Sequence, residues 1–316
     1  MGQVNKTRKN QREKYKITNW KSYNESLKNR GKITFWFDQE IQDKWYYSGP
    51  RKPGGKLEYS DIAIEFILTI KYLYHLGYRQ VGGFVESILL MGEIEELQVP
   101  SYTQIQRRSS GVEIDIRIRK GTKQSLDVVI DSTGLKVYGE GEWKVRKHGW
   151  NKHRTWRKIH VASDGKDLEI LSVVTTGNEV DDATAGIEVV EQIEESIGRI
   201  MGDGGYDKKK FREGISEQIE QIIPPQKNAV PSTDEKMNQR NEAIKSIKEI
   251  GREKWKKEIG YHIRSKSEVN MFRYKMAFTE KMSSRNPKNE ITEVNLKCKI
   301  LNKFAAIGMP KSVKVA

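Results

Sequence analysis

Apolar residues recur at helical spacing in the first strongly patterned part of the chain. Over residues 61–76 they lie three or four positions apart, and Gly77 follows as a stop signal. A second helix is predicted over 79–91, and Pro100 marks the entry to a short third helix. The pattern therefore predicts a small helical domain over residues 59–111.

The third predicted helix is polar and basic. It carries Arg107 and Arg108 among Thr and Gln side chains. Three short helices that end on a basic one are typical of a helix-turn-helix module, which lays its last helix in the major groove of DNA. Many small helical bundles share this pattern, so DNA binding by Arg107 and Arg108 is one interpretation and a plain bundle is the other.

The pattern changes to alternation after Gly111. Val and Ile alternate with charged residues over 112–120, and an apolar run of the β type follows over 126–131. Two more such runs, over 157–163 and 168–174, are joined by a turn that contains Gly. Three consecutive strands are therefore expected to form an antiparallel meander.

Helices alternate with strands in the rest of the chain. A helix is expected after the acidic pair at 181–182, because negative charges suit a helix N-terminus. The remaining expected elements are a strand at 199–203, a helix from about Lys208, a strand at 221–223, and helical segments over 233–258 and 261–278. This order indicates an α/β fold with a mixed sheet over residues 112–316.

The charge balance favours a polyanionic partner. Lys and Arg number 57 against 43 Asp and Glu, for a formal net charge of +14, which makes nucleic acid the leading candidate. No stretch approaches 18 uncharged apolar residues, so no membrane role is expected. Cys298 is the single cysteine, which excludes an internal disulfide, argues against a structural zinc site and suits a reducing cytoplasm.

Much of this positive charge lies at the N-terminus. Residues 1–32 hold ten basic and two acidic side chains with almost no apolar periodicity. A turn-rich segment over 48–55 separates them from the first predicted helix. We therefore expect residues 1–58 to form a flexible basic arm, with a merely solvating tail as the alternative.

Two carboxylates stand at the ends of predicted strands. Asp131 ends an apolar run, and Asp203 ends a later strand just before two glycines. Carboxylates at such positions suit Mg²⁺, which takes oxygen ligands. Glu268, on a predicted helix between Arg264 and Lys275, is the best third ligand. Each acid alone is most often a solvated residue, and the pattern by itself does not join the three.

Longer motifs connect these residues. Four segments follow one another in the order DSTGLKVYGEGEWKVRKHG (131–149), RTWRKIHVA (154–162), GDGGYD (202–207) and IPPQKNA (223–229). A fifth fits the signature Tyr, two residues, Arg, three residues, Glu, six residues, Lys, with Tyr261, Arg264, Glu268 and Lys275. By these motifs the chain, over roughly residues 60–310, resembles transposases of the insertion sequence 4 and 5 groups of bacteria and archaea.

The resemblance implies an α/β, ribonuclease H-like catalytic domain, a mixed five-stranded sheet with helices, preceded by the small helix-turn-helix-like domain. It implies that Asp131, Asp203 and Glu268 form a catalytic triad and bind two Mg²⁺ ions, with Mn²⁺ as a substitute. The substrates would be double-stranded DNA: the terminal inverted repeats of the element, which are cleaved, and a target to which the 3′ ends are joined. A homodimer in the synaptic complex and a place at the nucleoid in the cytoplasm are expected by analogy.

The same resemblance assigns phosphate contacts beside the cut. They fall to Tyr261, Arg264 and Lys275, which would position DNA rather than read its sequence. The chain departs from the pattern at Gly205 and Gln226, where Ala and Arg are expected more often. The second departure puts one phosphate contact in doubt.

Two other basic segments are expected at DNA. Lys144, Arg146 and Lys147 lie within residues 136–160, where three tryptophans could stack on bases or equally belong to the core. The helical segment at about 230–258 is expected to be an insertion that contacts transposon ends, or a solvated helix face.

Two rival functions are left open by the sequence. One is a metal-dependent DNA nuclease that cuts without strand transfer. The other is a catalytically dead DNA-binding regulator, for which the three carboxylates would be dispensable. All motifs stand in order, which favours an intact enzyme.

Overall fold

A five-stranded mixed sheet forms the centre of the expected catalytic part of the chain, residues 112–316. The computed structural model describes residues 14–50, 57–118, 125–137 and 156–315. Its sheet has the order β4-β3-β2-β5-β6, with β2 at Leu126–Lys136, β3 at Trp156–Asp164, β4 at Ile170–Gly177, β5 at Ile197–Met201 and β6 at Glu220–Ile222. The first three strands are antiparallel neighbours, while β5 runs parallel to β2 and β6 parallel to β5. The expected mixed five-stranded sheet is thereby confirmed.

Helices follow the strands in the expected order. The helix α8 (Asp182–Glu191) lies between β4 and β5, and α9 (Lys209–Gly214) lies between β5 and β6. Asp181 caps α8, since its carboxylate accepts a hydrogen bond from the amide of Ala183 at 3.1 Å. The sequence of three strands, helix, strand, helix, strand, helix fits an α/β, ribonuclease H-like domain.

Alternation along the strands separates two apolar faces. Leu126, Val128 and Ile130 of β2 belong to a core cluster with residues of α8 and α9. Residues of β3 that point the other way, Ile159 and Val161, join a second cluster with α12 (Ser265–Phe278) and α13 (Pro287–Ile307). Because successive strand residues face opposite sides, both faces of the sheet are covered.

The expected flexible arm over residues 1–58 is wrong for its described part. After β1 (Lys14–Ile17), the segment forms the helices α1 (Trp20–Arg30), α2 (Ile33–Trp36) and α3 (Gln39–Asp43). Trp36 and Trp45 are buried, and Phe37 stacks on Phe66 with ring centroids 4.9 Å apart. Three aromatic side chains without helical periodicity thus anchor a basic segment to the core. Residues 1–13 and 51–56 lie outside the described part.

The three helices predicted next are all present. They are α4 (Asp61–Leu73), α5 (Tyr78–Met91) and α6 (Tyr102–Ser109), and Ser60 and Ser101 cap α4 and α6. Their arrangement as a DNA-reading module stays a prediction.

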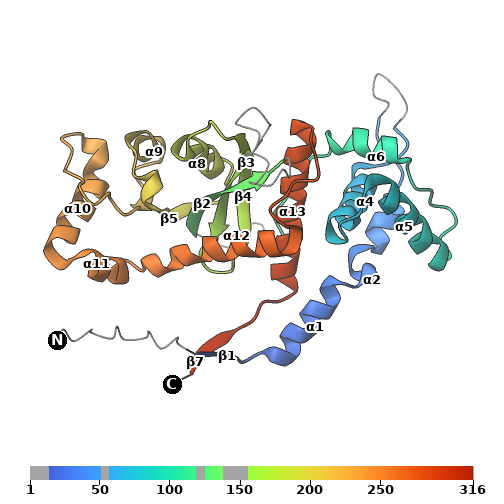
Figure 1. The fold of residues 1–316 in the computed structure, drawn as a ribbon, viewed down its shortest axis with the longest axis horizontal. Helices are drawn as coiled ribbons and strands as arrows, with labels where there is room; N and C mark the ends of the chain where they lie inside the picture. Colours follow the sequence, from blue (N-terminus) through green and yellow to red (C-terminus); the bar gives the residue numbers. More distant parts are fainter. Residues whose placement is uncertain (1–13, 51–56, 119–124, 138–155, 316) are drawn as a thin grey trace, which may run out of the picture.

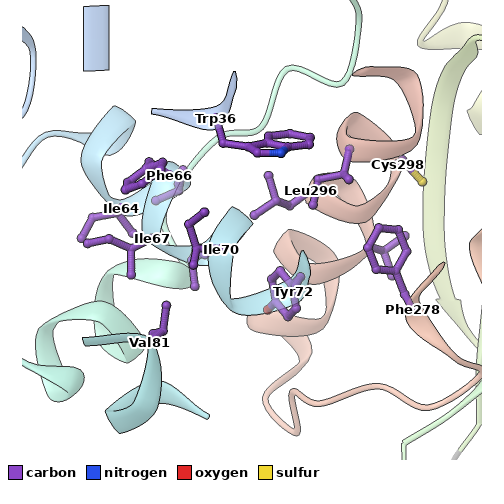
Figure 2. Packing of buried hydrophobic residues seen from close by; sticks show 14 of the residues in the cluster. Trp36, Ile64, Phe66, Ile67, Ile70, Tyr72, Val81, Phe278, Leu296 and Cys298 are labelled. Carbon is purple, nitrogen blue, oxygen red and sulfur yellow. The ribbon is translucent and has the colours of Figure 1, made fainter. Parts of the chain in front are cut away.

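One hydrophobic cluster joins these helices to the catalytic part. It runs from Trp36 through Ile64 and Phe66 to Phe278 and Leu296, as Figure 2 shows. The helix α13 stands between the N-terminal helices and the sheet, in contact with α4 on one side and β4 on the other (Figure 1). The helical and catalytic parts are therefore built around shared apolar side chains.

The strand expected at 112–120 does not form in its described residues, 112–118. Val112 and Ile116 are buried, but these residues belong to no strand. Its backbone is satisfied by side chains instead: the Ile118 amide donates to Glu169 Oε1 at 2.8 Å, and Asn302 Nδ2 donates to the Ile116 carbonyl at 2.8 Å. The alternation of apolar and charged residues therefore reflects burial of one side of this stretch, and it does not make the stretch part of the sheet.

The C-terminal third completes the fold. The segment expected to be helical at 233–258 contains a 3₁₀ turn η2 (Glu235–Met237) and the helices α10 (Asn238–Ile250) and α11 (Arg252–Glu258); η3 (Tyr261–Arg264) then leads into α12. The last strand, β7 (Ser312–Val315), pairs antiparallel with β1, so the first and last strands lie side by side (Figure 1). No helix within the described ranges is long and apolar enough to cross a membrane.

Candidate active site

Strand register brings two of the predicted acids together. Val129 of β2 pairs with Met201 of the parallel strand β5. Asp131 follows Val129 by two residues, and Asp203 follows Met201 by two, so the two carboxylates lie at the same level of neighbouring strands. Asp203 stands just beyond the end of β5, whereas Asp131 lies inside β2, because this strand continues to Lys136 through residues that the sequence predicted to be a loop. This part of the sheet lies next to η3 and the first turn of α12, where Glu268 stands.

Asp131 is the best-held acid of the three. Its side chain is 15% exposed, Oδ1 accepts a hydrogen bond from the Ser132 amide at 2.9 Å, and Oδ2 accepts one from the Ser267 hydroxyl at 3.0 Å. Burial raises the pKa of Asp131, and the opposing effects of Arg264 and Ser267 do not cancel this rise. These contacts fix the Asp131 carboxylate in the buried part of the site.

Asp203 is more open and is held by a turn. Its side chain is 47% exposed, and Oδ1 accepts a hydrogen bond from the Gly205 amide at 2.8 Å, which caps the 3₁₀ turn η1 (Gly204–Tyr206). A Cβ atom at position 205 would lie 2.8 Å from Asp203 Oδ1. Glycine at this departure from the family pattern therefore lets the carboxylate fold back onto the turn.

Glu268 is the most exposed acid, at 61%, and Arg264 connects it to the other two. The Arg264 guanidinium pairs with Glu268 through Nη1, and its Nη2 lies 3.4 Å from Asp131 Oδ2 and 3.9 Å from Asp203 Oδ2. Arg264 itself is 18% exposed, and its Nε is buried with no hydrogen-bond partner among the described residues. The three predicted acids therefore converge on one guanidinium.

The donor set fits a divalent cation chemically. Three carboxylates from separate elements supply the oxygen ligands that Mg²⁺ and Mn²⁺ prefer. In the described part of the chain, however, no three His, Cys, Asp or Glu side chains are arranged to hold a metal ion as they stand. The three carboxylates are thus of the chemical type that binds a metal ion. In this structure, however, they are arranged as an ion-pair cluster around Arg264.

Tyr261 is bound to the backbone beside Asp203. Its hydroxyl donates to the Gly202 carbonyl at 3.0 Å, and Lys256 Nζ lies 4.9 Å from the centre of its ring. Burial raises the pKa of Tyr261 to about 12, so the phenol is neutral. In this structure it ties η3 to the end of β5.

Of the other residues expected at DNA, those that the structure describes are not gathered at the triad. Lys275 is half-buried, two turns beyond Glu268 on α12. Arg107 is exposed on α6, whereas Arg108 donates to the Tyr59 carbonyl at 2.8 Å and pairs with Asp61. Lys144, Arg146 and Lys147 lie outside the described residues.

Two supporting residues were not singled out from the sequence. Ser267 was missed because an isolated serine on a helix carries no signal of its partner. Asp207 ends the motif GDGGYD, is fully buried, and pairs with Arg212 at 3.1 Å and Arg240 at 2.9 Å. Its two partners identify it as a structural acid that fixes the loop after Asp203.

Two family models match the chain, and each is described as a transposase DDE domain. One matches residues 28–140 and the other residues 122–302. The second match alone covers more than half of the 316 residues and includes the sheet and the three converging acids. Members of such families cleave and transfer DNA strands and normally use divalent metal ions. The chain belongs to the transposases that carry a DDE domain.

Proposed function

We propose that this protein is the transposase of an insertion sequence of group 4 or 5. It binds the terminal inverted repeats of its element, cleaves the ends and joins the 3′ ends to target DNA. The observation that carries this proposal is the convergence of Asp131, Asp203 and Glu268, from three separate elements, at one edge of the sheet.

These acids would hold two Mg²⁺ ions, or Mn²⁺ in their place. When bound, the ions activate the attacking hydroxyl or water and stabilise the leaving oxygen. The protein's own part is positional: the Ser132 amide and the Ser267 hydroxyl fix Asp131, and the Gly205 amide holds Asp203. Glu268 stands on the exposed side of a helix, where its pair with Arg264 would have to yield to a ligand.

The DNA contacts follow from charge and position. A net charge of +14 favours a long polyanion. Tyr261, Arg264 and Lys275 are proposed to lie along the phosphates at the cut. Lys144, Arg146, Lys147, Arg107 and Arg108 are proposed as further contacts, with Arg107 the more accessible of the α6 pair.

Two ends must be processed together, so we propose a homodimer in the synaptic complex. Its place of action would be the nucleoid in the cytoplasm. The segment at about 230–258 would contact the transposon ends from α10 and α11.

A cleavage and joining assay tests this function. The full-length protein is incubated with Mg²⁺ and duplex DNA copied from the flanks of its gene, as wild type, as Glu268→Gln and as Glu188→Gln. Glu188 is the matched control, because it is an exposed glutamate on α8, a helix to which no DNA contact is assigned. We expect nicked and joined products from the wild type and Glu188→Gln, and neither from Glu268→Gln.

The other outcomes select the rival functions. Cuts without joined products would indicate a nuclease. Binding without cuts by the wild type would indicate a regulator, in which Glu268→Gln changes nothing.

A further inference from the structure

Arg264 occupies the position among the acids that a cation must share. Its Nη1 pairs with Glu268, and its Nη2 faces Asp131 Oδ2 at 3.4 Å and Asp203 Oδ2 at 3.9 Å. These are the oxygens that a divalent ion would need as ligands. A guanidinium and a metal ion at the same carboxylates repel each other, so the two compete for one site.

The guanidinium is also incompletely satisfied where it stands. Arginine has five N–H donors in a fixed fork. Arg264 Nε is buried without a hydrogen-bond partner among the described residues, and the contact of Nη2 with Asp131 is long for a hydrogen bond. A phosphate would accept from Nε and one Nη together, in the two-pronged geometry that arginine favours.

The pair with Glu268 is the contact that Arg264 would have to give up to reach such a phosphate. Arg264 closes η3, directly before α12, and its hydrogen-bonding partner on the helix, Glu268, is four residues away. Because the Glu268 side chain is exposed, water competes for this pair. The ion pair is therefore an exchangeable contact, unlike the buried pairs of Asp207.

We propose that Arg264 is a positioning residue that acts as an internal counter-cation, displaced from the acids by the metal ions and transferred to a DNA phosphate. This inference rests on the proposed function, since it concerns the same site. It makes metal binding and DNA binding reinforce each other: the metal releases Arg264 for the phosphate, and the phosphate removes a competitor of the metal. By linkage the two effects are equal in size.

Calorimetric titration with Mn²⁺, in the absence of DNA, tests the competition. We expect full-length Arg264→Ala to bind Mn²⁺ about tenfold more tightly than the wild type. Lys266→Ala is the matched control: it removes one positive charge two residues further along the chain, but Lys266 donates to the Lys166 carbonyl rather than to the acids. Its Mn²⁺ affinity is expected to equal that of the wild type.

A second titration tests the coupling. With Ca²⁺ as an ion that supports binding without cutting, the wild type is expected to bind end DNA more tightly as Ca²⁺ is added, and Arg264→Ala to lose this gain. Circular dichroism confirms that the variants are folded. An independent measurement on the wild type is the Nε–H resonance of Arg264, identified by its loss in Arg264→Lys, which is expected to shift when Mg²⁺ is added.

Three results would overturn the inference: equal or weaker Mn²⁺ binding by Arg264→Ala, the same gain in Lys266→Ala, or an Arg264 resonance that ignores Mg²⁺. A wild-type protein that binds no Mn²⁺, with Asp131→Asn giving the same trace, would instead refute the metal chemistry of the proposed function itself.

Discussion

Single hydroxyl and amide groups decide how firmly the acids are held. Asp131 is mostly buried, and the Ser267 hydroxyl is one of its two neutral donors. A buried carboxylate that loses a donor is destabilised by about 1–3 kcal/mol. The hydrogen-bond donors that hold Asp131 are thus as much a part of this site as the carboxylate itself.

Removing that hydroxyl is expected to slow catalysis. Ser267→Ala should lower the rate of end cleavage by about tenfold, because one donor worth about 1.4 kcal/mol is lost from a metal ligand. Ser265→Ala is the control, since that serine is exposed and donates to the His262 carbonyl. Rates measured in single-turnover cleavage at saturating Mg²⁺ check this, and equal rates for both variants would contradict it.

A second residue couples stability to pH. Lys71 of α4 is buried, donates to the Ser283 hydroxyl at 3.1 Å, and lies over the rings of Tyr72 and Tyr78. Burial lowers the pKa of Lys71 to about 8, although Glu293 opposes this effect and Lys297 adds to it. An unfolded lysine keeps its proton up to about pH 10.

The sign of the effect follows from proton counts. Above about pH 8 the folded chain has lost a proton that the unfolded chain still holds, so the free energy of unfolding rises with pH. From about pH 8 to 9.5 we expect the free energy of unfolding, measured by urea denaturation, to rise by about 1.5 kcal/mol. Lys71→Met should abolish that gain, and an unchanged pH slope in Lys71→Met would show that other groups cause it.

At the scale of elements, α12 carries two kinds of aromatic side chain. Tyr274 is buried in the core shared with α13, whereas Phe272 is 64% exposed on the outer face, between Glu268 and Lys275. The two positions are separated by a single residue of the same helix. Substitutions at the two positions therefore separate the effect of core packing from the effect of helix propensity.

Substitution of this pair is expected to give opposite results. Tyr274→Ala should lower the free energy of unfolding by about 3–5 kcal/mol, since it leaves a cavity in a packed core. Phe272→Ala should change it by less than about 0.5 kcal/mol. Chemical denaturation measures both, and similar losses in the two variants would mean that the face assigned to α12 is wrong.

Elements with a strong local period were predictable from the sequence, and the others were not. The helices α4, α5 and α6 and the strands β2, β3 and β4 lie where the pattern placed them. The helices α1 to α3 were not predicted, because the segment shows no helical periodicity of apolar residues. Trp36 and Trp45 are held instead by residues distant in the sequence, such as Phe66. Residues 112–118 were wrongly predicted to form a strand. Alternation of apolar and polar residues reflects burial on one side, whereas strand pairing depends on which segments lie beside the chain.

The site shows the same division. Asp203 could be located at a strand end, whereas Asp131 was wrongly placed at one, because β2 continues to Lys136. The adjacency of the two acids depends on the register of β2 and β5, which no local pattern contains. Glu268 needed the family motif. Arg264 was expected at DNA and lies among the acids instead, because in the protein alone the nearest negative charges are its own.

At the scale of the whole molecule, charge governs DNA affinity. Each phosphate contact releases about one counterion, so the logarithm of the binding constant falls linearly with the logarithm of salt concentration. Lys275→Ala should reduce the magnitude of that slope by about 1. Lys44→Ala, which removes a lysine paired with Glu40 on the surface, should leave it unchanged. Gel-shift titrations across salt concentrations test this, and equal slopes for Lys275→Ala and the wild type would remove Lys275 from the phosphate contacts.

Under the proposed function, the cluster shared by the helical and catalytic parts would fix the distance between a DNA contact of α6 and the cut. Because α4 packs against both α6 and α12, a base read by α6 and a phosphate cut beside Glu268 would be held a set distance apart. One added base pair between them displaces the cut by about 3.4 Å along the duplex and rotates it away from the acids. The position of the cut is then set by its distance from the base read by α6. The ends of the element would therefore tolerate changes of sequence between that base and the cut better than changes of length.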